Sequence, residues 1–293
     1  MNAPVIVGFD GSETARSAVH YGAREAQRRG SELRIMHVLG WPVILPPFHA
    51  PYDQHDQGPR AAMLDLLAKA AHEVQQEHAG LKVTTHLLDG SASAVLLDAS
   101  RSAQLLVVGH RGAGGFPGLL TGSVATQVAG HAHCPVVIVH DDDHLTGDGP
   151  IVVGTDGSSG ARQAAEAAFQ QARLRDTELI LAYQTPRRST AGAIATSTLP
   201  FWATVGDAAA GAHGAGARHP DVRYRTEVVS GDSAASALIA LSARVEAGLL
   251  VVGSRGLGGF RGLVTGSTSR SLIDHAPCPL MVVPSGAASA PLP

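Results

Sequence analysis

Short apolar runs alternate with longer segments along the chain. In the first half, the apolar runs occupy residues 4–9, 33–39, 82–88, 105–109 and 136–139. The Ala-rich segments between them predict helices over residues 13–29, 60–79, 92–101 and 123–131. Strands that read as continuous Val, Leu and Ile runs are covered on both faces, and alternation with helices favours a parallel sheet. The pattern predicts a doubly wound, Rossmann-like α/β domain, in which ligands bind beyond the carboxyl ends of the strands.

The same pattern occurs a second time. The segments that recur are residues 5–12 as 151–158, 105–109 as 249–253, and 131–135 as 275–279. A polar, acidic stretch without periodicity separates the two copies at residues 140–149, which indicates a linker. We therefore expect two tandem domains of the same α/β plan, at residues 1–143 and 149–286.

Composition narrows the class of protein. With 293 residues, of which 44% are apolar and 16% charged, the chain is long enough for two apolar cores that need no metal or disulfide. The net charge of −3 and the scattered arginines argue against nucleic acid or a membrane as a partner. No apolar run approaches the roughly 20 residues that span a bilayer, and the first residues do not resemble a signal peptide. Cys134 and Cys278 each precede a proline and an apolar run, which suits buried reduced thiols, so we expect a cytoplasmic protein.

The strongest functional signal is a glycine-rich segment after the fourth apolar run of each copy. Residues 109–123 and 253–267 agree at 11 of 15 positions, whereas the first helices, 13–30 and 159–176, agree at 5 of 18. Such a segment, followed by a helix that begins at a serine, presents backbone N–H groups to an anion, because glycine permits positive φ and close approach. We therefore predict a phosphate site, and expect a nucleotide rather than free phosphate in it.

Glycine-rich segments of this kind occur in other settings as well. A surface loop with a Gly-Ser helix cap is the alternative to a phosphate site. A Walker loop is excluded, because no Gly-x-x-x-x-Gly-Lys is present and the only lysines are Lys69 and Lys82. The Gly-x-Gly-x-x-Gly dinucleotide pattern does not follow the first strand either.

Two motifs together resemble a known family. Each copy has Gly-x-Asp-Gly-Ser near its start and Gly-x2-Gly-x9-Gly-Ser after its fourth apolar run, which is similar to the ATP-binding branch of the universal stress proteins. The resemblance covers nearly the whole chain. It implies a five-stranded parallel sheet of order 3-2-1-4-5 in each domain, with ATP bound where strands one and four meet.

Carried over to matching positions, the resemblance implies nucleotide contacts in both copies. Asp10 and Asp156 would face the ribose or a phosphate-bound Mg²⁺, because a carboxylate beside a triphosphate needs a cation between them. The alternative is that Asp-Gly-Ser forms only a turn and a helix cap. The main chain at Val38 would contact adenine, and since Gln184 stands there in the second copy, we expect unequal affinities. The implied contacts are Gly8, Asp10, Val38, Val108, Gly109, Arg111, Gly112, Gly122, Ser123 and Val124, and then Gly154, Asp156, Gly253, Arg255, Gly256, Gly266, Ser267 and Thr268.

Weaker signals have competing explanations. Arg111 and Arg255 could contact phosphate as forked donors or remain solvated. The sequence His131-x-His133-Cys134 looks faintly like a metal site, but the second copy has Pro277 in place of the second histidine, so we expect no metal at these residues. Residues 41–52 are either a lid over adenine or a mobile Pro-rich loop, and residues 185–202 are their counterpart.

The last apolar runs of the two copies, residues 136–139 and 280–283, are uncharged sheet edges that must be covered. We predict that they pair across a pseudo-twofold, which leaves other surfaces for a homodimer. The overall prediction is an ATP-binding regulator of the stress response with an unknown protein partner. An enzyme is not expected, because no hydrolytic triad or phosphate-reading lysine can be assembled. A slow ATPase or nucleotidyl transferase and a scaffold without ligand are the alternatives.

Overall fold

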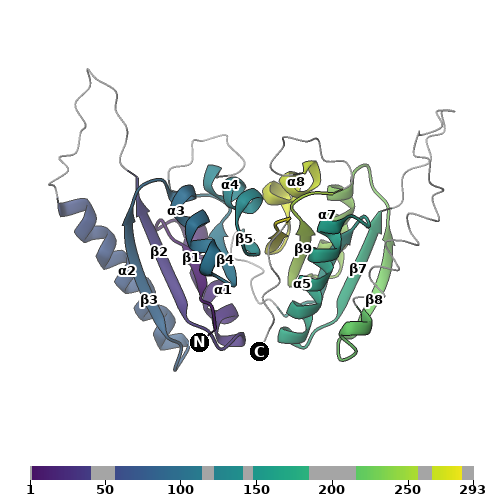
Figure 1. The fold of residues 1–293 in the computed structure, drawn as a ribbon, viewed down its shortest axis with the longest axis horizontal. Helices are drawn as coiled ribbons and strands as arrows, with labels where there is room; N and C mark the ends of the chain where they lie inside the picture. Colours follow the sequence, from purple (N-terminus) through teal and green to yellow (C-terminus); the bar gives the residue numbers. More distant parts are fainter. Residues whose placement is uncertain are drawn as a thin grey trace, which may run out of the picture.

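The computed structural model describes residues 2–40, 57–113, 122–140, 148–184, 216–256 and 266–285. The first half contains β1 (Val5–Gly8), α1 (Glu13–Arg28), β2 (Leu33–Leu39), α2 (Gln57–Glu77), β3 (Val83–Asp89), α3 (Ala92–Ala99), η1 (Ser100–Ser102), β4 (Leu105–Gly109), α4 (Ser123–His131) and β5 (Val136–Val139). The second half contains β6 (Ile151–Thr155), α5 (Ser159–Arg175), β7 (Leu179–Gln184), β8 (Tyr224–Val229), α7 (Ala234–Arg244), β9 (Leu249–Gly253), α8 (Ser267–His275) and β10 (Leu280–Val283) (Figure 1). The helices and strands predicted for the first half are all present, and their ends differ from the predicted ones by a turn or less.

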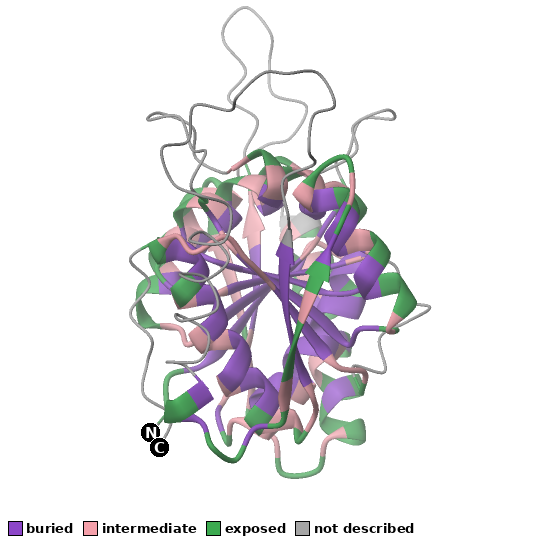
Figure 2. Ribbon diagram, turned by 90° about the vertical axis from the view of Figure 1, so that its right-hand side faces the viewer, coloured by how far each residue is buried: buried purple, intermediate pink, exposed green. Residues whose placement is uncertain are grey.

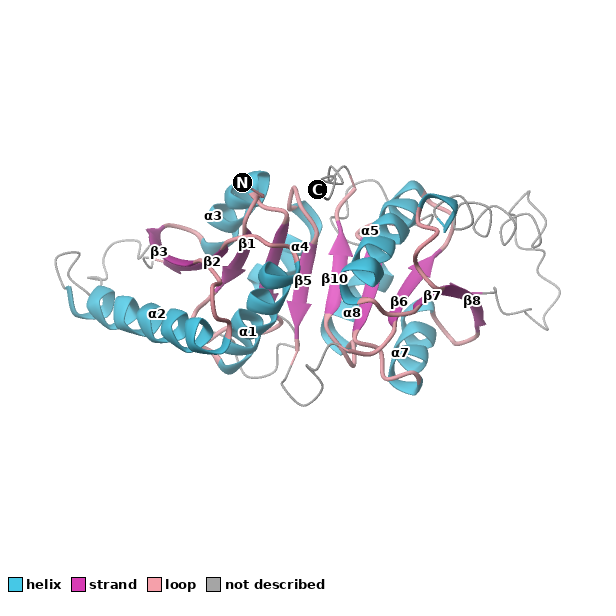
Figure 3. Ribbon diagram, turned by 90° about the horizontal axis from the view of Figure 1, so that it is seen from below, coloured by secondary structure: helices cyan, strands magenta, loops and turns pink. Residues whose placement is uncertain are grey.

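The described strands form one sheet of ten, in the order β3-β2-β1-β4-β5-β10-β9-β6-β7-β8. Each half therefore has the order 3-2-1-4-5, and pairing within each half is parallel. β5 and β10 pair antiparallel, with Leu280 opposite Ile138 and Val282 opposite Val136 (Figure 3). The predicted fold class and the predicted pairing of the two last strands are both confirmed.

Helices cover both faces of this sheet. Alternate residues of the inner strands, such as Val5 and Ile6 of β1, point to opposite faces and are fully buried, whereas the edge strands β3 and β8 are largely intermediate or exposed (Figure 2). On one face the core is closed by α1, α2 and α5, and on the other by α3, α4, α7 and α8. Both cores run from one half of the chain into the other, and α4 lies beside α8 where the halves meet (Figure 1).

Some predicted features lie outside the described residues. These are most of the linker (141–147), the lid segment 41–52 with its counterpart 185–202, and the centres of the glycine-rich segments, residues 114–121 and 257–265. Among the helices that the structure describes, none is sufficiently long and apolar to cross a bilayer.

Candidate functional site

In the first half, the site is built where the ends of β1 and β4 lie side by side. Asp10 follows β1, and its Oδ1 accepts hydrogen bonds from the backbone N–H of Ser12 (3.0 Å) and from its hydroxyl (2.6 Å). Its Oδ2 accepts a hydrogen bond of 2.7 Å from the backbone N–H of Ala113, in the glycine-rich segment. Gly11 has a φ of 84°, which glycine adopts readily, and Ser12 Oγ caps α1 by accepting from the N–H of Ala15. The Asp-Gly-Ser motif thus forms a turn and a helix cap, and it also holds the glycine-rich segment.

The glycines of the segment allow close approach. A Cβ at Gly112 would collide with Oδ2 of Asp10, and one at Gly109 would lie 2.9 Å from the backbone carbon of Thr14. A Cβ at Gly122 would lie 3.2 Å from the carbonyl oxygen of His110, the same oxygen that accepts a 2.8 Å hydrogen bond from the Gly122 N–H. Positive φ was also expected here. Among the glycines of the segment that the structure describes, none has a positive φ. Glycine is therefore required at these positions because a Cβ would not fit, and not because of the backbone conformation.

The helix that follows the segment begins without a side-chain cap. Gly122 is the N-cap of α4, with an extended backbone (φ −70°, ψ 140°), and no side chain of the described residues caps the helix. Ser123, the first residue of α4, is exposed, and Val124 is half-buried. The first N–H groups of an α-helix have no partner within the helix and carry a partial positive charge. The end of α4 is therefore suited to an anion.

The second half repeats this geometry. Asp156 Oδ1 accepts a 2.9 Å hydrogen bond from the Ser158 N–H, and Ser158 Oγ caps α5. A Cβ at Gly256 would collide with Oδ2 of Asp156, as in the first half. The N–H of Gly266 donates to the carbonyl of Ser254 at 2.9 Å, and Gly266 is the N-cap of α8 without a side-chain cap among the described residues. The predicted residues Ser267 and Thr268 lie in the first turn of α8.

The two sites differ at the first turn of α1 and α5. Thr14, which is buried, donates a 2.6 Å hydrogen bond from Oγ1 to the carbonyl of Arg111. Gly160 replaces it in the second half, and a Cβ at Gly160 would lie 2.6 Å from the carbonyl oxygen of Arg255. A Cβ at Gly253 would likewise lie 2.8 Å from the backbone of Gly160. The sequence carries no signal for the role of Thr14, because the threonine-to-glycine exchange is one of many differences between helices 13–30 and 159–176.

Other predicted contacts lie at the strand ends or pack in the interior. A Cβ at Gly8 would lie 3.0 Å from Leu96, and one at Gly154 would lie 2.7 Å from Leu238, so both glycines make room for a helix. Val108 is buried in β4, and Val38 is half-buried near the end of β2. A neighbour of Val38 joins two strand ends, because His37 Nδ1–H donates to the carbonyl of Phe9 at 2.7 Å.

The remaining candidates are two arginines, one histidine and two cysteines. Arg111 and Arg255 are exposed in the glycine-rich segments. His131 donates from Nδ1 to the carbonyl of Gln127 at 3.1 Å. Cys134 and Cys278 are free and buried, as predicted, and burial raises the pKa of each thiol to about 12.

The chain is similar to proteins of one known family. The model of the universal stress protein family matches residues 1–140 and again residues 149–284. A universal stress protein of Mycolicibacterium smegmatis is 33% identical, with 95% of this chain and 96% of the relative covered. A universal stress protein of Mycobacterium tuberculosis is 34% identical, with 95% of each chain covered. Among solved structures, a universal stress protein from Archaeoglobus fulgidus has the same fold, with a TM-score of 0.74, 21% identity, and coverage of 97% of this chain and 99% of that one.

Proposed function

The chain belongs to the universal stress protein family in a tandem form, and we propose that each half binds one ATP, with Mg²⁺, at the glycine-rich segment. The observation that carries the proposal is the joining of two motifs in each half. An aspartate after the first strand meets a glycine that has room for no side chain, beside a helix N-terminus that no side chain of the described residues caps. The N–H groups of the first helical turn are the part of this arrangement that can receive a phosphate.

The donor set fits a nucleotide triphosphate with a divalent ion. A helix N-terminus alone contributes about 0.3–2 kcal/mol to anion binding, whereas a micromolar Kd needs about 8 kcal/mol. The remainder would come from other N–H groups of the segment and from burial of a base near Val38. A carboxylate has about four lone-pair sites, and the three hydrogen bonds to Asp10 leave one for Mg²⁺. Asp10 would hold Mg²⁺ through this site, and the ion would offset the repulsion between the carboxylate and the phosphates.

We further propose that the protein is a regulator in the stress response and not an enzyme, and that it acts in the cytoplasm as a homodimer with a protein partner. Among the described residues of the site, Asp10 and Asp156 are the candidates for a general base, and the segments supply arginines but no lysine. A slow ATPase that uses the same two sites is the second candidate, supported by these carboxylates. Loss of ATP turnover in Asp10→Ala, at unchanged ATP affinity, would favour it.

The proposal is tested on freshly purified full-length protein. The protein is denatured and the released nucleotide is identified by chromatography and mass spectrometry, and stripped protein is then titrated with ATP and Mg²⁺ in a calorimeter. We expect up to two ATP per chain, with unequal affinities, and an affinity at least tenfold lower at both sites when Gly112→Ala and Gly256→Ala are combined. If stripped wild-type protein binds no ATP at millimolar concentration, the proposed function is wrong.

A further inference from the structure

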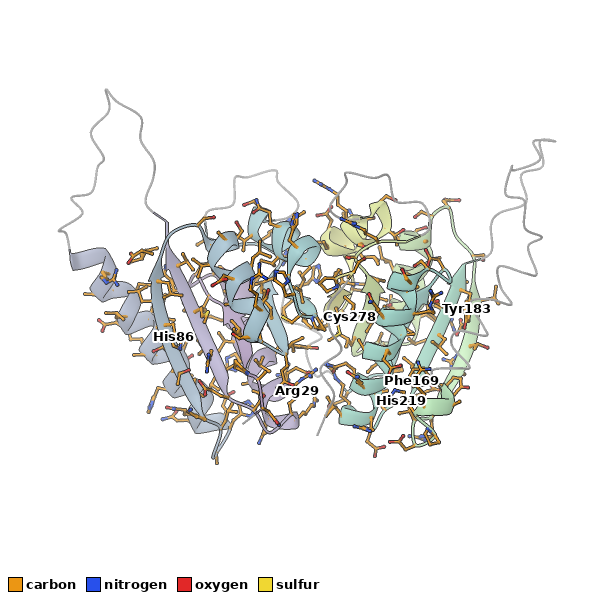
Figure 4. The ribbon with its side chains drawn as sticks, viewed as in Figure 1. Arg29, His86, Phe169, Tyr183, His219 and Cys278 are labelled. Atoms are coloured by element: carbon orange, nitrogen blue, oxygen red, sulfur yellow. The ribbon has the colours of Figure 1, made fainter. Side chains whose placement is uncertain are left out.

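A fully buried carboxylate lies between the two halves of the chain. Glu25 of α1 has an exposure of 0%. Across the junction its Oε1 accepts from Arg175 at 2.9 Å, and its Oε2 accepts from the Gln171 amide at 3.1 Å, both from α5. On its own helix, Arg29 donates to Oε2 at 3.2 Å (Figure 4 labels Arg29 at the junction). One carboxylate of the first half therefore organises charged groups of both halves.

These residues correspond to one another in the repeat. When residues 13–30 are matched to residues 159–176, Glu25 falls on Gln171 and Arg29 falls on Arg175. The junction therefore places one carboxylate and one amide at equivalent positions, and two arginines at equivalent positions around them. Arg28, which donates to Oε1 of Glu25 at 3.2 Å, matches Leu174 and has no counterpart. The charge of one half is not repeated in the other.

Side-chain size is also unlike across the junction. Tyr21 of α1 is 1% exposed, and its hydroxyl accepts a 2.5 Å hydrogen bond from Arg175, whose guanidinium lies 5.6 Å from the Tyr21 ring centroid. The matching residue of α5 is Ala167. A bulky, hydrogen-bonded ring in one half thus stands where the other half has a methyl group.

Both charged groups are ionised in the folded protein. Burial alone would raise the pKa of Glu25, but the charges of Arg175, Arg29 and Arg28 overcome this and lower it to about 2. Burial alone would lower the pKa of Arg175, and the neighbouring Tyr21 and Glu25 raise it instead. A buried carboxylate of this kind is tolerated because its partners are in place.

We propose that Glu25 and Gln171 make the two halves specific for each other, so that a first half recognises a second half and rejects a like half. Pairing of two first halves would bring two Glu25 carboxylates together in a buried space. Pairing of two second halves would leave two arginines and two amides without a carboxylate. Only the unlike pair places a single buried carboxylate beside an amide, with arginines from both halves as its partners, and the partner surface of α1 is therefore α5.

Single substitutions reproduce the like pairings inside the full-length chain. Gln171→Glu creates the two-carboxylate arrangement, and Glu25→Gln creates the arrangement without a carboxylate. The double variant E25Q/Q171E moves the carboxylate to the other half and keeps both arginines. We expect each single variant to lower Tm by roughly 5–10 °C, and the double variant to regain at least half of the larger loss.

A second measurement and a control separate this proposal from simple damage. The Tm of Gln171→Glu relative to wild type should recover as pH falls toward 5, because one of two adjacent carboxylates then takes a proton. Glu166→Gln is the matched control, since Glu166 also lies on α5 but accepts from Arg218 and His219 of its own half. Combining Glu166→Gln with Gln171→Glu should not restore the Tm that Gln171→Glu loses. If the losses in E25Q/Q171E are additive, or if Gln171→Glu has the Tm of wild type, the proposal is wrong. If both single variants fail to fold, a folded double variant supports it and an unfolded one contradicts it.

Discussion

The carboxylate of Asp10 accepts a 2.7 Å hydrogen bond from the backbone N–H of Ala113, 103 residues further along the chain. The strand order explains this meeting, because β1 and β4 are neighbours in the sheet and their carboxyl ends lie at the same edge. A short motif near the start of each half and a glycine-rich segment near its end thereby become one site.

Gly112→Ala should lower the ATP affinity of the first site at least tenfold. The added Cβ would collide with Oδ2 of Asp10 and displace the segment from the aspartate, and overpacking of this kind costs about 1–3 kcal/mol. Calorimetric titration should then show one site in place of two. Gly256→Ala is the matched variant and should remove the other site. Two sites remaining in either variant would contradict the prediction.

Asp10→Asn should remove the effect of Mg²⁺ at the first site. The single amide oxygen can accept from the Ala113 N–H or from the Ser12 N–H but not from both, and the negative charge is lost. We expect ATP to bind in EDTA with nearly wild-type affinity, and the gain in affinity on adding Mg²⁺ to fall about tenfold or more. Titrations with and without Mg²⁺ in the Gly256→Ala background measure the first site alone. An unchanged Mg²⁺ effect would show that Asp10 does not face the ion.

Thr14→Val should weaken the first site and leave the second unchanged. Valine keeps the shape of threonine but cannot donate to the carbonyl of Arg111, so a buried hydrogen bond worth about 1 kcal/mol is lost. Chemical denaturation should register this loss, and calorimetry should register a lower ATP affinity at one site. Gly160→Thr should be destabilising, because its Cβ would meet the carbonyl oxygen of Arg255. A stable Gly160→Thr variant with two equal sites would contradict this account of the asymmetry.

The free energy of unfolding should fall steeply in acid because of Glu25. The folded-state pKa of Glu25 is lowered to about 2 from an ordinary value of 4.5. The contribution of ionised Glu25 to the free energy of unfolding is therefore complete above pH 4.5 and is lost as the pH falls from 4.5 toward 2. Urea denaturation at a series of pH values gives the free energy of unfolding at each pH. Between pH 4.5 and 2 this free energy should fall less with pH in Glu25→Gln than in wild type. Asp98→Asn, in an exposed pair with Arg101, is the control and should leave the slope unchanged.

Cys134 and Cys278 should not react with thiol reagents in the native protein. Both are buried, and burial raises the pKa of each to about 12, so almost no thiolate exists near pH 8. A colorimetric thiol assay should detect two thiols per chain in denaturant and nearly none without it. Rapid modification of the folded protein would contradict this prediction.

The sequence predicted the fold closely because its pattern is strong and occurs twice. Continuous apolar runs such as those of β4 and β9 are characteristic of buried parallel strands, and the repeat fixed where each half begins. The pairing of β5 with β10 followed from the need to cover two apolar edges. Apolar runs, an internal repeat and uncharged strand edges can all be read directly from a single sequence.

The site was predicted less completely, because spacing locates a motif but not its contacts. The need for space at Gly109 and Gly112 depends on how closely α1 and Asp10 approach, which only the structure shows. Thr14 was hidden in a helix that differs between the two halves. The cluster around Glu25 was missed for another reason: Glu25 and Arg175 are 150 residues apart, and each resembles an ordinary surface residue of an amphipathic helix.

Because β5 and β10 pair within one chain, the two halves form a dimer-like unit that dilution cannot separate. Two halves on separate chains would meet at a rate that depends on how much protein the cell holds. Here the covalent connection keeps their effective concentration on the order of millimolar, whatever the expression level. The relation between the two sites is therefore the same when the protein is scarce as when it is abundant.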